Sequence, residues 1–480
     1  MSTVISEAQV SQLVEDLVRK FQQEPVAAVP KSHPAPVAGV SPEEGVFATV
    51  DQAVEAAFHA YQAFSEVSLE RRKVFIEAIR QAAVAHAEEY ARLNVEETKF
   101  GRAEHKVQKI MAAARKTPGV EDLHTDVCTG DHGMTLIEAA PFGVIGAVTP
   151  CTNPVSTVVN NSISIISAGN TVTFNPHPTA KNISNLTVRT LNRALIHAGS
   201  QMPLIYSVAD PTLETSQALM KHPRVRMLLI TGGGPVVKLA MTSGKRVVAA
   251  GPGNPPVIVD DTADIEKAAR CIVTGASFDN NVLCTAEKEV LVFENVADRL
   301  IAAMQGHGAR LIGREQVDRM TPILSEPGEP YPHPVRKFIG QNAGVLLKQI
   351  GITAGDEIRL VICETPFEHP LVQAEMLMPI LPIVRVRDLD EALDKAIKAE
   401  HGNKHSAMMH SQNITNMSRV AREIETTIFV KNASSFAGLG IGGEGFTTLS
   451  IAGPTGEGLT SAKTFTRQRR CVLADAFRIV

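Results

Sequence analysis

The sequence predicts an α/β protein, because short apolar runs alternate with segments of helical length through most of the chain after residue 140. This alternation is typical of parallel sheets joined by right-handed helical crossovers. The 480 residues suffice for two to four domains of roughly 100–200 residues each. A content of 44% hydrophobic and 20% charged residues indicates a globular chain. We therefore expect a globular protein with more than one α/β domain.

The start of the chain, residues 6–21, is expected to form a short amphipathic helix. Its apolar side chains recur at helical spacing and form one stripe, made of Val10, Leu13, Val14, Leu17, Val18 and Phe21. Residues 22–45 form a Pro-rich linker, because prolines preclude a helix and favour an extended chain. A helix on such a tether must bury its stripe on another surface. It either folds back on its own domain or an oligomer partner, or it docks on a separate protein.

The main body begins with helical patterns and continues as two series of strands and helices. The helical patterns cover 50–64 and 69–101. Strands of the first series are expected at 143–149, 171–174, 204–208, 225–230 and 246–250, with helices between them such as 183–199. The second series begins with a strand at 256–259, a helix at 264–273 and a strand at 288–293. We place a first domain at 46–250, a second at 251–445 and a C-terminal segment at 446–480.

Charge, hydropathy and cysteine spacing disfavour several classes of protein. The net charge is −4 and no long Lys/Arg block occurs, which argues against nucleic acid as the main partner. No apolar run approaches the roughly 18 residues of a membrane span, and the amino terminus does not resemble a secretory signal. The six cysteines lie far apart without a CxxC, so we expect reduced thiols in a cytosolic enzyme. His401 and His405 lack a third ligand at metal spacing, so no metal site is expected.

Two short stretches contain residues suited to chemistry. Thr231-Gly232-Gly233-Gly234 follows an apolar strand and precedes a helix, where glycines let backbone N–H groups approach a phosphate. A purely structural turn is the alternative. Cys284 ends a polar loop; it is either an inert small apolar side chain or, with Asn280 and Asn281 nearby, part of a loop wall. The long Gly-rich segment 438–460 is typical of a functional loop or a flexible connection.

Taken together, these stretches resemble the aldehyde dehydrogenase superfamily over essentially the whole chain after residue 46. The resemblance implies a Rossmann-type NAD-binding domain, a catalytic cysteine domain and a small strand extension for oligomerisation. Residues 141–154 look like the strand and loop that carry the oxyanion-stabilising amide, which assigns that role to Asn153. Cys284 takes the place of the nucleophile. The implied NAD contacts are Thr149, Pro150, Thr152, Asn175, His177, Thr231, Gly232, Gly233, Gly234, Ala250, Gly251 and Glu375.

One departure from the general family pattern narrows the expected reaction. Hydrolytic members activate the deacylating water with a glutamate, but here the stretch reads Ala250-Gly251-Pro252-Gly253-Asn254, 34 residues before Cys284. An alanine cannot act as a general base. The chemistry would then stop at a thioester, and the family precedent for removing the acyl group is coenzyme A. The sequence is similar to CoA-acylating propionaldehyde dehydrogenases of bacterial microcompartments, in which an N-terminal helix directs the enzyme into a protein shell.

The expected function follows from this resemblance. The protein would convert a short-chain aldehyde such as propionaldehyde, with CoA and NAD, to acyl-CoA and NADH through a Cys284 thioester. It would lie in a microcompartment lumen within the cytoplasm, with residues 6–21 docked on a shell protein. Segments 126–140 and 469–477 would pair subunits into a homodimer or homotetramer. The alternatives are a hydrolytic aldehyde dehydrogenase that releases a free acid, and a non-catalytic cargo or scaffold protein.

Overall fold

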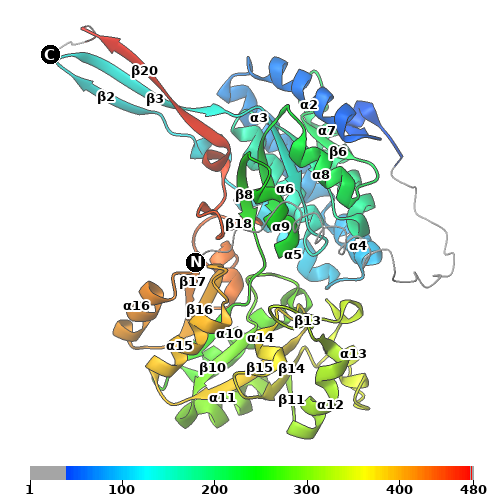
Figure 1. Ribbon diagram of the computed structural model, residues 1–480, viewed down its shortest axis with the longest axis vertical. Helices are drawn as coiled ribbons and strands as arrows, with labels where there is room; N and C mark the ends of the chain where they lie inside the picture. The colour runs from blue at the N-terminus through cyan, green and yellow to red at the C-terminus, as the bar shows by residue number, and fades with distance from the viewer. Residues whose placement is uncertain (1–38, 476, 478–480) are drawn as a thin grey trace, which may run out of the picture. The chain divides into compact units, whose positions relative to one another are not determined.

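The computed structural model describes residues 39–475 and residue 477 (Figure 1). The predicted helix 6–21 and the linker as far as residue 38 lie outside the described residues. The first described element is a short 3₁₀ turn, η1 (Pro42–Glu44), which leads into strand β1. Among the described residues, no helix is long and apolar enough to cross a membrane.

The first sheet contains six strands, and every strand pair in it is parallel. In spatial order the strands are β1 (Val46–Phe47), β6 (Ile205–Val208), β5 (Thr171–Asn175), β4 (Val144–Val148), β7 (Val225–Thr231) and β8 (Arg246–Ala250). Their apolar runs are buried on both faces, as expected for strands covered by helices on either side. The predicted strands of the first series are therefore confirmed.

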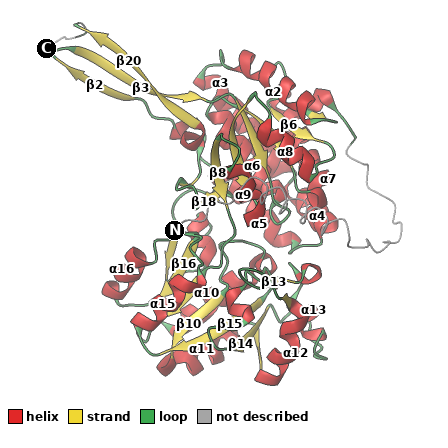
Figure 2. Ribbon diagram, in the orientation of Figure 1, coloured by secondary structure: helices red, strands yellow, loops and turns green. Residues whose placement is uncertain are grey.

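Helices cover this sheet in two groups (Figure 2). Helices α2 and α8 contact each other, while α6 and α7 contact each other and α3. The helices are α2 (Val50–Phe64), α3 (Leu69–Ala85), α4 (Ala87–Thr98), α5 (Ala103–Lys116), α6 (Pro154–Ser167), α7 (Lys181–His197), α8 (Leu213–Lys221) and α9 (Gly234–Met241), with 3₁₀ turns η2 (Val120–Asp122) and η3 (Pro178–Ala180). The helical pattern predicted for 69–101 forms two helices, α3 and α4, because the backbone leaves helical geometry at His86 (φ −104°, ψ 9°).

The second sheet contains seven strands, and all of its strand pairs are parallel. In spatial order they are β11 (Ala309–Ile312), β14 (Leu360–Glu364), β15 (Ile380–Val386), β10 (Glu289–Phe293), β9 (Pro256–Val259), β16 (Ser406–His410) and β17 (Ile428–Lys431). Its helices are α10 (Ile265–Ser277), α11 (Glu294–Gly306), α12 (Arg314–Leu324), α13 (Ala343–Lys348), α14 (Pro370–Gln373), α15 (Leu389–Ala399) and α16 (Ile414–Glu423), with η4 (Phe278–Asn281), η5 (Arg336–Phe338), η6 (Ser435–Leu439) and the short pair β12 (Ser325–Glu326) and β13 (His333–Pro334). The predicted α/β class is confirmed.

A three-stranded antiparallel arm projects from the first-sheet domain (Figure 1). It consists of β2 (Asp126–Gly130), β3 (Gly133–Pro141) and β20 (Thr466–Ala474). Strand β20 starts before and ends before the predicted 469–477, and the positive φ of Asp475 (59°) follows its last residue. The arm exposes three large apolar side chains, Val127, Val472 and Leu473.

The C-terminal segment returns to the first sheet before it enters the arm. It contains β18 (Ile451–Ala452), β19 (Gly458–Leu459) and η7 (Ala462–Phe465). Asn160, in the completely buried helix α6, accepts a hydrogen bond from the backbone N–H of Leu449 at 3.0 Å. Asn170 donates to the carbonyl of Phe465 at 2.9 Å. Buried amide groups thus fix a segment whose glycines would otherwise leave it unconstrained.

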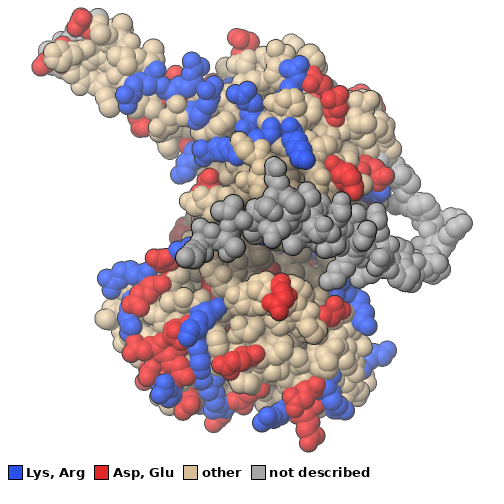
Figure 3. Space-filling view, viewed as in Figure 1, with Lys and Arg blue, Asp and Glu red and all other residues tan. Residues whose placement is uncertain are grey.

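The surface of the second-sheet domain mixes acidic and basic side chains, as the lower half of the view in Figure 3 shows. Many of these groups form ion pairs; Arg385, for example, bridges Glu364 and Asp298 at 2.5 Å each. Solvent-exposed pairs of this kind contribute about 0–1 kcal/mol each to stability. This surface therefore offers no large region of one charge on the face shown.

Candidate active site

The predicted cofactor residues lie at the carboxyl ends of neighbouring parallel strands. Thr149 and Pro150 follow β4, Asn175 ends β5, Thr231 ends β7 and Ala250 ends β8. Because β5, β4, β7 and β8 are adjacent, the structure brings these residues to one edge of the first sheet. This is the edge at which open α/β sheets bind their ligands.

The glycine turn at this edge is open toward any ligand. A Cβ placed on Gly232 or Gly234 would meet no atom within 4 Å. Gly233 is the N-cap residue of α9 and has no side chain to satisfy the helix's first N–H groups. The Gly232 N–H donates to the carbonyl of Ala250 at 3.1 Å, which anchors the turn to β8. A bare helix N-terminus behind an open glycine turn fits the pyrophosphate of a dinucleotide such as NAD.

Other predicted cofactor residues differ in what they can offer. The Thr149 hydroxyl is buried without a partner in the described part of the chain, so it can still bind a ligand. Asn175, in contrast, is buried, and its carboxamide is bonded to Ser216 (2.7 Å) and Thr215 (2.6 Å) of α8. Any contact between Asn175 and a cofactor would therefore fall to its backbone. Burial lowers the pKa of His177 to about 4, so that ring is neutral near pH 7.

The cysteine follows an unusual turn. Asp279, Asn280 and Asn281 have φ values of 50°, 53° and 66°, in the left-handed region that Asp and Asn tolerate best among non-glycine residues. The expectation that this polar stretch forms a loop wall is wrong, because Asn280 and Asn281 are each only 1% exposed. Their amides bind backbone carbonyls instead, including that of Gly340. The polar residues thus hold a buried turn, and Cys284 itself is partly exposed at its end.

Three charged side chains influence the Cys284 thiol: Glu375, Lys288 and Lys109. Burial and, to a smaller extent, the nearby Glu375 carboxylate raise the pKa of Cys284 to about 12, although Lys288 and Lys109 oppose this shift. Lys288 donates to the carbonyls of Asn281 (3.0 Å) and Leu283 (2.9 Å), and these hydrogen bonds stabilise the turn. Burial raises the pKa of Glu375 to about 7. At rest, the cysteine is therefore a protonated thiol next to a carboxyl group that titrates near neutrality.

The stretch that replaces the hydrolytic glutamate lies directly against the nucleophile. A Cβ on Gly253 would lie 2.8 Å from the carbonyl oxygen of Cys284 and 2.9 Å from the ring of His405. The Gly253 N–H also donates to the Glu375 carboxylate, which partly counteracts the rise in that group's pKa. Ala250 is 3% exposed and presents only a methyl group. No side chain of Ala250-Gly251-Pro252-Gly253 can therefore serve as a base.

Asn153 belongs to a buried polar cluster that the sequence analysis missed. Its Oδ1 accepts a hydrogen bond from Lys109, and both Lys109 and Lys106 bind the carboxylate of Asp279. Lys106, Lys109 and Asp279 are at most 2% exposed. A sequence signal existed, because both lysines occupy the same helical stripe as the buried residues Ile110 and Ala113.

His401 and His405, the two histidines considered as metal ligands, have different contacts. His401 stacks on Tyr331, with ring centroids 3.5 Å apart. His405 is buried against Gly253, where burial lowers its pKa to about 4. Within residues 39–475, no group of three or more potential ligands is arranged to hold a metal ion.

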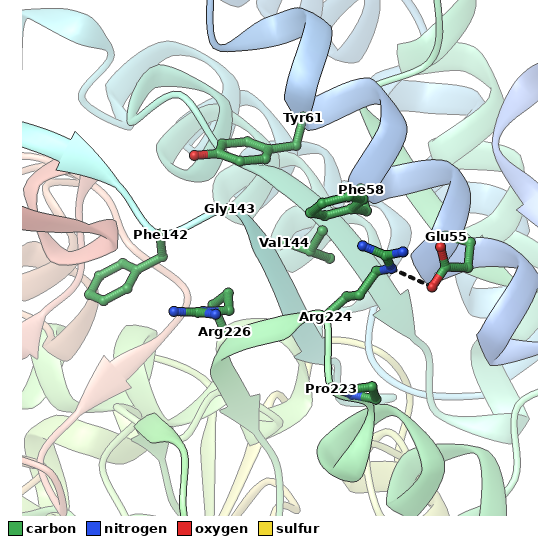
Figure 4. Close-up of a pocket in the computed structure, with 9 residues that line it drawn as sticks. All are labelled: Glu55, Phe58, Tyr61, Phe142, Gly143, Val144, Pro223, Arg224 and Arg226. Carbon is green, nitrogen blue, oxygen red and sulfur yellow. Dashed lines mark hydrogen bonds and ion pairs between the residues drawn. The ribbon is translucent and has the colours of Figure 1, made fainter.

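A separate pocket of about 640 Å³ lies at the opposite edge of the first sheet (Figure 4). It is lined by Gly143 and Val144 at the start of β4 and by Arg224 and Arg226 around the start of β7. Arg224 binds Glu55 at 2.5 Å and covers the ring of Phe58. Because this pocket is at the amino ends of the strands, it is distinct from the edge that carries Thr149 and Thr231.

Comparison with known proteins matches residues 38–447 to the aldehyde dehydrogenase family. An acetylating acetaldehyde dehydrogenase of Escherichia coli strain K12, EutE, is 47% identical over 481 residues, covering 99% of this chain and 100% of the relative. The structure of a Rhodopseudomonas palustris propionaldehyde dehydrogenase with bound CoA and an acylated cysteine is 48% identical, with a TM-score of 0.89 over 91% of this chain and 100% of that chain.

A propionaldehyde dehydrogenase from the fucose utilisation bacterial microcompartment of Clostridium phytofermentans is 46% identical, also with a TM-score of 0.89 over 91% of this chain and 100% of that chain. The matches cover nearly all of the described residues. They confirm the resemblance that the order of the sequence motifs predicts. The chain therefore belongs to the aldehyde dehydrogenase family.

Proposed function

We propose that the protein converts a short-chain aldehyde, CoA and NAD to acyl-CoA and NADH. The observation that carries the proposal is the methyl group of Ala250, at the position where hydrolytic relatives hold a glutamate. Without a water-activating base, a thioester on Cys284 is released by a better nucleophile than water, and a thiol is partly ionised near neutrality. The CoA and acylated cysteine in the Rhodopseudomonas palustris structure support this route.

In the first half of the reaction, the Cys284 sulfur bonds to the aldehyde carbonyl carbon, the carbonyl π bond opens to an oxyanion, and the thiol proton passes to solvent. The Cys284 N–H and the Asn153 amide donate hydrogen bonds to the developing oxyanion, an arrangement that typically contributes about 10²–10³-fold per donor. NAD, when bound, supplies the hydride acceptor. The residues that would hold it are Thr149, Pro150, Thr152, Asn175, His177, Thr231, Gly232, Gly233, Gly234, Ala250, Gly251 and Glu375.

In the second half, the CoA sulfur attacks the thioester carbonyl. The bond between that carbon and the Cys284 sulfur breaks, and the departing thiolate takes up a proton that balances the one lost by the CoA thiol. Lys288 and Lys109 both favour the thiolate form of Cys284, so they stabilise the charge that appears on the leaving sulfur. Gly253 packs closely against the Cys284 carbonyl, an approach that a side chain at this position would prevent.

We further propose that residues 6–21 dock on a shell protein and place the enzyme in a microcompartment lumen. The alignment with the Escherichia coli relative covers 99% of this chain, so it includes most of this segment. The microcompartment origin of the Clostridium phytofermentans relative is consistent with this location. The exposed Val127, Val472 and Leu473 of the arm support pairing of subunits into a dimer or tetramer.

The test is to measure NADH, acyl-CoA and free acid separately, with propionaldehyde, in the presence and absence of CoA. The proposal expects steady-state NADH formation only with CoA and an equal amount of acyl-CoA. Comparable NADH formation without CoA, together with free acid, would support the hydrolytic alternative. No NADH under either condition, from a protein that binds NAD, would favour a non-catalytic scaffold.

A further inference from the structure

We propose that Lys109 is a positioning residue that holds the Asn153 amide with its N–H₂ group toward the reacting carbonyl. This inference rests on the role that the proposed function gives to Asn153. The inference adds a requirement on the orientation of the Asn153 amide, which the positions of the nucleophile and the oxyanion donor alone do not reveal. An amide has an acceptor end and a donor end, and only the donor end can stabilise an oxyanion.

The contact with Lys109 determines which end of the amide faces the helix. An ammonium group has three donors and no acceptor, so the amide atom that it contacts must be the carbonyl oxygen, Oδ1. Lys109 is 2% exposed and its charge is balanced by Asp279, so water does not compete for this contact. The opposite orientation would place amide hydrogens against the ammonium hydrogens. Lys109 therefore excludes the rotated amide.

The donor end of Asn153 remains available for substrate. One N–H of Nδ2 donates to the Thr152 hydroxyl at 3.3 Å, and the second has no acceptor among the described residues. Asn153 is also the N-cap residue of α6, a position where asparagine commonly binds the helix's own backbone. It makes no such capping bond here. The Asn153 side chain thus binds Lys109 and does not cap helix α6.

The same cluster connects the donor to the nucleophile. Asp279, which holds Lys109, begins the left-handed turn that leads to Cys284. Its carboxylate also accepts from the Arg102 N–H at 2.7 Å, and a Cβ on Gly101 would collide with it at 2.0 Å. The carboxylate position is therefore fixed on several sides, and through Lys109 it fixes Asn153.

Lys106 provides a matched comparison on the same helix. It binds the same Asp279 oxygen at 3.1 Å and the backbone carbonyl of Thr152 at 3.4 Å, but it makes no hydrogen bond to the Asn153 side chain. Lys106→Met and Lys109→Met each remove one positive charge next to Asp279. Only Lys109→Met frees the Asn153 amide to rotate. A difference between the two variants thus reports on amide orientation and not on the charge of the cluster.

The experiment is a double-mutant cycle on the burst of NADH formed without CoA, which reports acylation of Cys284 alone. Lys109→Met is expected to slow the burst by about 10²-fold, close to the loss of one oxyanion donor. Asn153→Ala should slow it by a similar factor. The double variant Lys109→Met/Asn153→Ala should be no slower than Asn153→Ala alone. In the Asn153→Ala enzyme, Lys106→Met should still slow the burst, by a smaller factor than Lys109→Met slows the wild type.

Two controls keep the result specific. Alkylation of Cys284 by iodoacetamide, followed by peptide mass spectrometry, needs the thiolate but no oxyanion donor. Lys109→Met should therefore slow alkylation much less than it slows the burst. Lys109→Gln retains an N–H donor toward Oδ1 and should recover part of the lost rate. If Lys109→Met does not fold, Lys109→Leu and Lys106→Leu carry the same cycle, because leucine also lacks a donor toward Oδ1.

The inference is overturned if Lys109→Met slows the Asn153→Ala enzyme by the same factor as it slows the wild type. It is also overturned if alkylation falls as far as the burst, because Lys109 would then act on the thiol. A failure of the proposed function is seen separately, as the absence of CoA stimulation in the steady state of the wild-type enzyme. The CoA-free burst does not depend on that outcome.

Discussion

Replacing Asp279 by asparagine is expected to lower the free energy of unfolding by about 3–5 kcal/mol, the usual cost of breaking a buried ion pair from one side. Lys106 and Lys109 are 1% and 2% exposed, and in the described part of the chain Asp279 is the only carboxylate paired with either. Burial lowers the pKa of Lys109 to about 8, so its proton can be lost at pH 7 for about 1.4 kcal/mol. Lys109 can escape the penalty by losing its proton, so most of the expected loss of unfolding free energy comes from the unpaired charge of Lys106.

The sign of the pH dependence follows from Lys109. Its folded-state pKa lies below its ordinary value of 10.5, so between about pH 8 and 10.5 the unfolded chain binds more protons. This group therefore makes the wild type more stable as pH rises through that range. At pH 9 Lys109 is already mostly neutral and depends less on Asp279. The effect of Asp279→Asn should be smaller at pH 9 than at pH 7.

The measurement is urea unfolding followed by circular dichroism at both pH values, with Asp356→Asn as the matched control. Asp356 also pairs with a buried cation, Arg102 at 2.7 Å, but its side chain is 63% exposed. An exposed carboxylate of this kind contributes about 0–1 kcal/mol. Equal urea midpoints for Asp279→Asn and Asp356→Asn would refute the reasoning that the buried lysines require Asp279.

Three further predictions concern the nucleophile and the amino-terminal segment. Cys284→Ala should abolish the NADH burst while NAD binding, measured by calorimetry, stays nearly intact. Cys271→Ala is the control and should keep measurable turnover. A burst from Cys284→Ala would contradict the assignment of Cys284 as the nucleophile. Because burial raises the pKa of Cys284 to about 12, its alkylation rate should rise about tenfold per pH unit from pH 7 to 9.5, whereas a plateau near pH 9 would indicate an ordinary thiol. Deletion of residues 1–21 should leave activity within about twofold and abolish co-sedimentation with shells, and loss of activity would favour the fold-back alternative.

The strands and the order of the motifs were predictable from sequence because both depend on local pattern. Buried parallel strands are continuous apolar runs, and the turn at Thr231–Gly234 has a composition that few other structures require. The end of α3 at His86 was not predictable, because the local pattern on which the prediction depends does not change there. The buried stripe of α3 continues through Ala83 into α4 at Ala87 and Tyr90, so the helical spacing passes the break without interruption.

The buried cluster around Asp279 illustrates a different limit. Lysine is among the residues least often buried, so Lys106 and Lys109 are naturally read as solvent-facing. Their burial depends on a carboxylate 170 or more residues away, and no local pattern contains that pairing. Likewise, the Asp-Asn-Asn run before Cys284 is typical of a polar loop. Only the tertiary contacts of these side chains convert it into a buried turn.

Ala250→Glu tests whether the missing carboxylate determines the reaction's outcome. The substitution places a base at the end of β8, beside the glycine stretch that contacts Cys284. General-base assistance typically contributes about 10²–10⁴-fold, so the variant should release free acid from the thioester without CoA. Because Ala250 is 3% exposed, the larger side chain should also reduce CoA-dependent turnover by crowding the site.

Ala250→Gln separates these two effects, because glutamine has nearly the volume of glutamate but cannot accept a proton from water at neutral pH. Both variants should lose CoA-dependent turnover to a similar degree, and only Ala250→Glu should gain hydrolysis, with a rate that rises as its carboxyl group ionises. Free acid and acyl-CoA would be quantified separately by chromatography. If the wild type already hydrolyses its thioester as fast as it transfers the acyl group to CoA, then Ala250 does not determine the acceptor, because the alanine enzyme would already activate water by another route.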